Sequence, residues 1–150
     1  MIIVFEGPDG AGKTTLFKAV AQLRGYKDTY IDRMFISDIV YALKRNDIST
    51  VEEKKEQLIK FNESFSPFHI YVKAQIEDQR TALISKGEAV DVANMNWQDI
   101  SYDSVFHTLL SGYGRRIIVH RTGKSIQRCA IEIVKAIKEI KWREDAAIDK

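Results

Sequence analysis

The sequence has little of what marks secreted, membrane-spanning or nucleic-acid-binding proteins. Its one cysteine, Cys129, excludes an intramolecular disulfide framework and fits a reducing compartment. No apolar run approaches the roughly 18 residues of a membrane span, and the N-terminus reads as a strand and not as a signal peptide. The formal net charge of +2 is too small to favour nucleic-acid binding. We therefore expect a cytoplasmic protein with neither membrane nor nucleic acid as a partner.

Signs of a second domain are also scarce. The 150 residues include only two prolines, and no repeat or low-complexity stretch separates two halves. This length is enough for one hydrophobic core. We expect a single domain over residues 1–150.

A phosphate-binding loop stands near the start of the chain. Residues 7–14 read GPDGAGKT and match G-x-x-x-x-G-K-[ST] at every fixed position, between a short apolar run and a helical pattern. Glycines let successive backbone N–H groups point at phosphate oxygens, and the following helix presents its positive end to the same anion. Lys13 can then reach the β and γ phosphates, and the Thr14 hydroxyl can hold Mg²⁺.

Hydrophobic periodicity predicts strands and helices that alternate along the chain. Strands are expected at residues 2–5, 28–32, 68–74 and 117–120, and helices at 13–24, 34–45, 49–65, 76–85, 97–110 and from 126 onward. Ser49 with Glu52 is a capping-box pattern for the helix at 49–65, although Thr50 with Glu53 fits equally well, and Ser125 is the expected N-cap of the last helix. This order predicts a three-layer α/β/α fold with a short parallel sheet. Residues 86–94 are weakly patterned, and we expect a lid at about 80–95.

Ligands in such sheets bind beyond the carboxyl ends of the strands, so the residues directly after each strand are candidates for the site. Asp32 and Arg33 end the second strand, where a carboxylate can hold Mg²⁺ through water or accept a proton, and an arginine can grip a phosphate. Arg80 and Lys86 follow the third strand. Arg121 and Gly123 follow the last strand, where a turn can line a nucleobase pocket.

The segments that carry these residues resemble thymidylate kinases. FEGPDGAGKTT is similar to the opening of that family, the Asp32-Arg33 pair to its Asp-Arg motif, QIEDQRTALISKGE to its lid region, and IIVHRTGKS to its adenine-side loop. The segment from Asp32 to Asp38 also resembles the [DE]-R-x-x-x-S-D segment of deoxynucleoside kinases. The span between the first helix and Asp32 is shorter than in thymidylate kinases, which predicts a compact version of the family without its usual acceptor-binding helices.

The resemblance implies ATP as the phosphoryl donor, Mg²⁺ as the cofactor and a deoxynucleotide or deoxynucleoside as the acceptor. It implies catalytic roles for Lys13, Asp32 and Arg80, because the loop lacks a cation at Gly10 or Ala11 and would draw it from the lid. The implied metal ligands are Thr14 and Asp32, and the implied acceptor contacts are Asp9, Arg33 and Phe35. The implied ATP contacts are Gly7, Asp9, Gly10, Ala11, Gly12, Lys13, Thr14, Thr15, Arg121 and Gly123.

The leading functional hypothesis is ATP-dependent phosphoryl transfer to a deoxynucleoside monophosphate, with dTMP favoured. The first alternative is a deoxynucleoside kinase, and an alternative of another class is a nucleotide-binding regulatory module without kinase activity. A GTPase-like switch is weaker, because the sequence has no N-K-x-D segment for guanine. The sequence leaves the oligomeric state open, and a homodimer is one option.

Overall fold

The computed structural model describes residues 1–149, and its elements follow the predicted order. They are β1 (Ile2–Glu6), α1 (Lys13–Leu23), β2 (Thr29–Asp32), α2 (Phe35–Lys44), α3 (Ile48–Phe65), β3 (Phe68–Lys73), α4 (Ile76–Ser85), α5 (Val92–Leu109), β4 (Arg116–His120) and α6 (Ile126–Ile148). Among the helices described over these residues, none has both the length and the apolar composition that crossing a bilayer requires.

The four strands form one parallel sheet in the order β2-β1-β3-β4. The first strand of the chain is therefore central, and the loop that follows it leaves from the middle of the sheet. Phe5 lies opposite Asp32 in the register, so β2 ends level with the start of that loop. The phosphate-loop residues and Asp32 thus share the carboxyl edge of the sheet.

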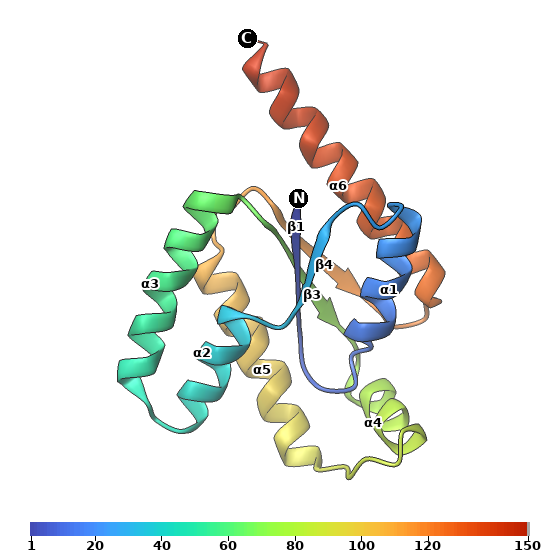
Figure 1. Cartoon of the computed structure of the whole chain (residues 1–150). Coiled ribbons are helices and arrows are strands. Elements are labelled where there is room, and N and C mark those ends of the chain that lie inside the picture. The colour runs from blue at the N-terminus through green and yellow to red at the C-terminus, as the bar shows by residue number, and fades with distance from the viewer. Residues whose placement is uncertain (150) are drawn as a thin grey trace.

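Helices cover both faces of the sheet, which confirms the three-layer fold (Figure 1). Phe68, Ile70 and Val72 of β3 pack into one core cluster with α1 and α6, and this cluster also buries Cys129. Tyr71, on the opposite face of the same strand, packs into a second cluster with α2, α3 and α5. Because successive side chains of a strand point to opposite faces, one short strand serves both cores. Helix α4 lies beyond the carboxyl end of the sheet (Figure 1).

Two predicted helix starts were wrong. Helix α3 is capped by Asp47 and not by Ser49: the Asp47 carboxylate accepts a hydrogen bond of 3.1 Å from the backbone N–H of Thr50. Helix α5 begins at Val92, five residues before the predicted start, because Asp91 caps it by accepting from the N–H of Asn94. An aspartate at an N-cap is as favourable as a serine, so pattern alone did not separate the candidates. The segment without regular structure after α4 shortens accordingly to residues 86–91.

Candidate active site

The loop between β1 and α1 lies against the backbone of two other elements. Gly7 and Gly10 adopt φ of +150° and +77°. A Cβ at Gly7 would lie 2.5 Å from the carbonyl oxygen of Val72, and one at Gly10 would lie 2.7 Å from that of Gln79. Both positions therefore need glycine for conformation and for space. Helix α1 starts directly after the loop without a side-chain cap, so its first N–H groups remain available to an anion.

Lys13, Thr14 and Asp32 meet at this loop. The Lys13 side chain is buried, and its ammonium group donates to the carbonyl oxygen of Pro8 at 3.1 Å. Burial, with a further contribution from the charge of Arg33, lowers the Lys13 pKa to about 8. The Thr14 hydroxyl donates to the Asp32 carboxylate at 3.0 Å. This hydroxyl–carboxylate pair supplies the hard oxygen donors that Mg²⁺ prefers, so these residues fit the expected metal.

Asp9 and Arg33 form an ion pair beside the loop. Gln98 of α5 holds the aspartate from the other side. Its amide oxygen accepts from the backbone N–H of Asp9 at 2.8 Å, and its NH₂ group donates to the Asp9 carboxylate at 3.1 Å. Burial alone would raise the Asp9 pKa, but the bonds from Arg33 and Gln98 and the arginine's charge outweigh it, so the pKa is lowered. Asp9 is therefore a fixed carboxylate.

Glu6, the last residue of β1, is fully buried beneath this pair. Its carboxylate accepts from the backbone N–H of Met34 at 2.7 Å and from the hydroxyl of Ser37, which lies 2.7 Å from the hydroxyl of Tyr102. Burial raises the Glu6 pKa to about 7, although these hydrogen bonds act in the opposite direction. The Glu6 side chain, from β1, thus accepts the free N–H group at the start of α2, which has no side-chain cap of its own.

Sequence reasoning missed Glu6 and Gln98. Each lies in an otherwise apolar pattern: Glu6 ends a buried strand, and Gln98 shares the buried face of α5 with Met95 and Tyr102. A polar side chain inside a buried stripe needs a partner. That signal was present in the sequence, but it does not identify the partner.

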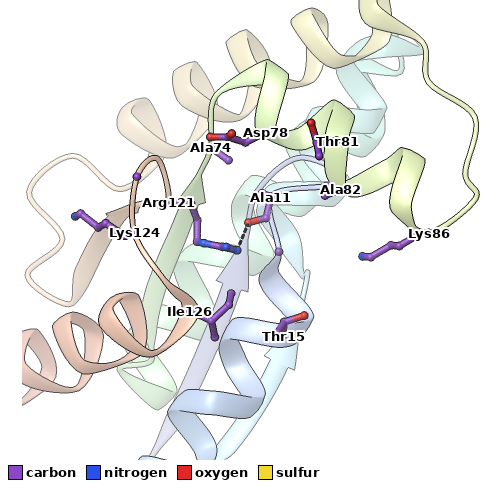
Figure 2. A pocket seen from close by; sticks show the side chains of 13 residues that line it. Ala11, Thr15, Ala74, Asp78, Thr81, Ala82, Lys86, Arg121, Lys124 and Ile126 are labelled. Carbon is purple, nitrogen blue, oxygen red and sulfur yellow. Dashed lines mark hydrogen bonds between the residues drawn. The ribbon is translucent and has the colours of Figure 1, made fainter.

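A cavity of about 510 Å³ opens over the loop on the side of α4 and of the turn after β4 (Figure 2). Arg121 projects into it and donates to the carbonyl oxygen of Ala11 at 3.3 Å. Gly123 and Lys124 line the cavity from the same turn, and Thr15 from the start of α1. Its size and its place beside the phosphate loop suit the nucleoside part of a donor nucleotide.

A second, more polar cavity of about 260 Å³ lies on the other side of the same loop. Its lining carries as many negative as positive side chains. Asp9, Asp32 and Glu88 contribute carboxylates, and Lys13, Arg33 and Lys86 contribute cations. Within residues 1–149 no group of three or more His, Cys, Asp or Glu side chains could hold a metal ion, which is compatible with Mg²⁺, an ion usually held by one or two carboxylates and phosphate oxygens.

Two predicted site residues lie outside both cavities. The Arg80 side chain is exposed on α4 and lines neither of them. Phe35, at the start of α2, packs edge-to-face on Phe61 with ring centroids 5.6 Å apart and lines neither cavity. The lid role of Arg80 and of residues 80–95, and the acceptor contact of Phe35, stay predictions.

Two structures of deoxyadenosine kinase from M. mycoides superpose on this chain with TM-scores of 0.69 and 0.68 over 93% of this chain and 100% of theirs, at 12% and 11% sequence identity. The chain has the P-loop kinase fold. One of the two kinase structures contains the products dCMP and a flexible dCDP, and the other contains dCTP. No protein-family model and no curated protein sequence matches the chain. These neighbours do not support thymidylate kinase over its relatives.

Proposed function

We propose that the protein transfers the γ-phosphoryl group of ATP to a hydroxyl group of a deoxynucleoside. The products are ADP and the deoxynucleoside monophosphate. The observation that carries this proposal is the Asp9–Arg33 ion pair, which lies in one small cavity with Lys13, Thr14 and Asp32. The fold shared with a deoxyadenosine kinase supports the same acceptor class.

The charge balance of that cavity favours an uncharged acceptor. Three carboxylates already face three cations before any nucleotide enters. The triphosphate adds negative charge, and its metal offsets only part of it. A second phosphate group would need a cation of its own, but Arg33 is held by Asp9 and Lys13 is needed at the donor phosphates, which leaves only Lys86 among the three cations of this cavity. A sugar hydroxyl needs only an acceptor for its proton, which the Asp9 carboxylate provides.

Each loop residue has a role in this reaction. The backbone N–H groups of residues 7–15 and the Lys13 ammonium would hold the β and γ phosphates. Thr14 and Asp32 would hold Mg²⁺, which when bound neutralises charge on the phosphate oxygens. The acceptor hydroxyl, oriented by Asp9, forms the new bond to the γ-phosphorus as the bond from that phosphorus to the β-phosphate oxygen breaks, and its proton passes to the Asp9 carboxylate. The 510 Å³ cavity beside Arg121 and Gly123 would take the donor nucleoside.

A second candidate is transfer to a deoxynucleoside monophosphate, with dTMP favoured. The Asp9-Gly10 loop sequence favours it, and Arg33 would be the phosphate contact if it left Asp9. If no acceptor gave any turnover, the result would instead favour a nucleotide-binding regulatory module.

A coupled assay for ADP formation, run with MgATP and each deoxynucleoside and deoxynucleoside monophosphate, separates these hypotheses. We expect turnover with at least one deoxynucleoside and much less with any monophosphate. Turnover with monophosphates alone would reject the proposal in favour of the second candidate. Calorimetry that detects ATP binding but no second ligand would support the regulatory module.

The Asp9→Asn variant sharpens the comparison. Losing the carboxylate releases Arg33, so kcat/KM for deoxynucleosides should fall while any activity with monophosphates rises. Asp38→Asn, at a half-exposed aspartate on α2, is the matched control. An equal fall for both acceptor classes would contradict the assignment of Asp9 to the acceptor hydroxyl.

A further inference from the structure

The two cavities over the phosphate loop share four lining residues. Three of them, Gly10, Gly12 and Thr15, belong to the loop and the first turn of α1, and the fourth is Lys86. Among residues 1–149, Lys86 is the only cation that lines both cavities. The proposed function, on which this inference rests, places the donor nucleoside in the larger cavity and the transferring phosphoryl group beside Lys13 and Thr14 in the smaller one. A cation that lines both cavities therefore lies beside the donor's phosphate chain.

We propose that Lys86, and not Arg80, neutralises the transferring phosphoryl group. The loop offers no cation of its own at Gly10 or Ala11, so the charge must come from another element. Negative charge spreads over the oxygens of the transferring group, and a preorganised cation is the main way that a protein stabilises it.

The backbone at Lys86 belongs to a hydrogen-bonded cap at the end of α4. Helix α4 ends in two nested hydrogen bonds, from Glu88 N–H to Leu83 O and from Gly87 N–H to Ile84 O, both 3.0 Å long. Gly87 adopts a φ of +71° between them, which is the geometry of a Schellman C-cap. The cap holds Lys86 as the last residue before the chain turns away.

Helix α4 is itself docked on the phosphate loop. Gln79, in its first turn, is fully buried, and its amide donates to the carbonyl oxygen of Ala74 at 2.8 Å. The backbone of Gln79 lies so close to Gly10 that no Cβ would fit between them. Because the first turn of α4 is docked in this way, the helix places Lys86 at its far end with the side chain pointing toward the cavity (Figure 2).

The same docking turns Arg80 away. Asp78, Thr81 and Ala82 face the 510 Å³ cavity. Arg80 is two positions from both Asp78 and Ala82, which places it nearly opposite them on a helix with about 100° per residue. To reach the phosphates it would need a rotation of α4 that the contact between Gln79 and Gly10 opposes.

Two of the other cations that line these cavities have carboxylate partners: Lys124 pairs with Glu132 at 3.0 Å, and Arg33 pairs with Asp9. Arg121 has no carboxylate partner among residues 1–149, but its guanidinium donates to the loop carbonyl oxygen of Ala11 at 3.3 Å. Across the described chain, residues 1–149, no carboxylate lies within 4 Å of the Lys86 ammonium group. Lys86 can therefore meet an incoming phosphate without breaking an existing pair.

Steady-state kinetics of Lys86→Met, Lys86→Arg and Arg80→Met test the assignment. We expect kcat to fall about 10² to 10³-fold in Lys86→Met, as for other single groups that stabilise transition-state charge. Lys86→Arg keeps the charge and should recover at least about tenfold of that loss, while Arg80→Met should stay within about threefold of the wild type. Arg80→Met tests the rival assignment, and Lys60→Met, at an exposed lysine on α3, is the control for folding. A fall in Arg80→Met as large as that in Lys86→Met would overturn the proposal.

A binding experiment separates failure of this inference from failure of the proposed function. MgADP with aluminium fluoride mimics the transferring phosphoryl group and needs no acceptor. We expect Lys86→Met to lose about tenfold or more of the extra affinity that the fluoride gives, with MgADP affinity itself within about threefold of the wild type. If the wild type phosphorylates no acceptor, the proposed function fails and this measurement decides the role of Lys86. Equal affinity gains in wild type and Lys86→Met would then overturn it.

Discussion

Replacing Glu6 by glutamine should remove a pH dependence from the stability of the fold. In the folded protein burial raises the Glu6 pKa from 4.5 to about 7. As pH rises from 4.5, the unfolded chain ionises at this position while the folded chain keeps its proton until about pH 7. Ionisation therefore favours the unfolded state across that window, and this group's contribution to stability falls until pH 7 and is constant above it.

The size of the effect comes from the same two pKa values. At about 1.4 kcal/mol for each pH unit, the shift of Glu6 lowers the free energy of unfolding by on the order of 3 kcal/mol between pH 4.5 and 7. Glutamine has nearly the same shape and does not ionise. Compared with the ionised carboxylate it has one acceptor oxygen in place of two, so it loses the bond from either Met34 or Ser37, a cost of about 1–3 kcal/mol relative to the ionised form, and its own stability does not change with pH at this position.

Urea unfolding of wild type and Glu6→Gln at pH 5 and pH 7.5 measures this difference. The wild type should lose stability relative to the variant by on the order of 3 kcal/mol between the two values. His69, whose pKa burial lowers to about 4, titrates in both proteins and cancels from the comparison. Glu63→Gln, at an exposed glutamate on α3, is the matched control. Parallel pH dependences in wild type and Glu6→Gln would contradict this prediction, because they would mean that Glu6 is ionised at its ordinary pKa in the folded protein.

Three further predictions concern the phosphate loop and its metal ligands. Lys13→Ala should lower turnover by several orders of magnitude, because catalysis here is mostly positioning and charge stabilisation. The control Lys18→Ala, on the exposed side of α1, should have little effect. Near-normal turnover of Lys13→Ala would reject the phosphate-loop assignment. Asp32→Asn should raise the Mg²⁺ concentration for half-maximal turnover by about 10 to 100-fold, and an unchanged Mg²⁺ titration would remove Asp32 from the metal site. Gly10→Ala should lower the melting temperature more than Gly25→Ala does. Both glycines have a positive φ, but only a Cβ at Gly10 would meet the backbone of another element. Equal shifts in melting temperature would show that the loop moves to accept the added Cβ.

Local pattern was enough to predict the loop and the order of the elements. The loop is recognisable because its glycines, Lys13 and Thr14 act through spacing along a short stretch of chain. The strands and helices are recognisable because burial against a sheet imposes a period of two or of 3.6 residues. The placement of Asp32 beside Thr14 was also predictable, since both stand at the carboxyl end of parallel strands.

The ends of helices were less predictable, because several residues in a row could cap them. Ser49 fits a capping pattern, yet Asp47 caps α3, since packing of α2 against α3 fixes where the chain turns between them. The same competition moved the start of α5 to Val92. Propensity ranks such caps nearly equally, so tertiary contacts decide among them.

The P-loop, the parallel sheet and the Mg²⁺-compatible pair at one edge could all be predicted from the chain alone, because they depend on local spacing and on strand direction. The folded structure was needed to place Glu6 under Met34 and Gln98 against Asp9, which are contacts across 28 and 89 residues of chain. It was also needed to show which face of α4 meets the loop. Helical periodicity says which residues share a face, but docking against Gly10 selects that face, and it brings Lys86 to the phosphate loop while Arg80 faces away.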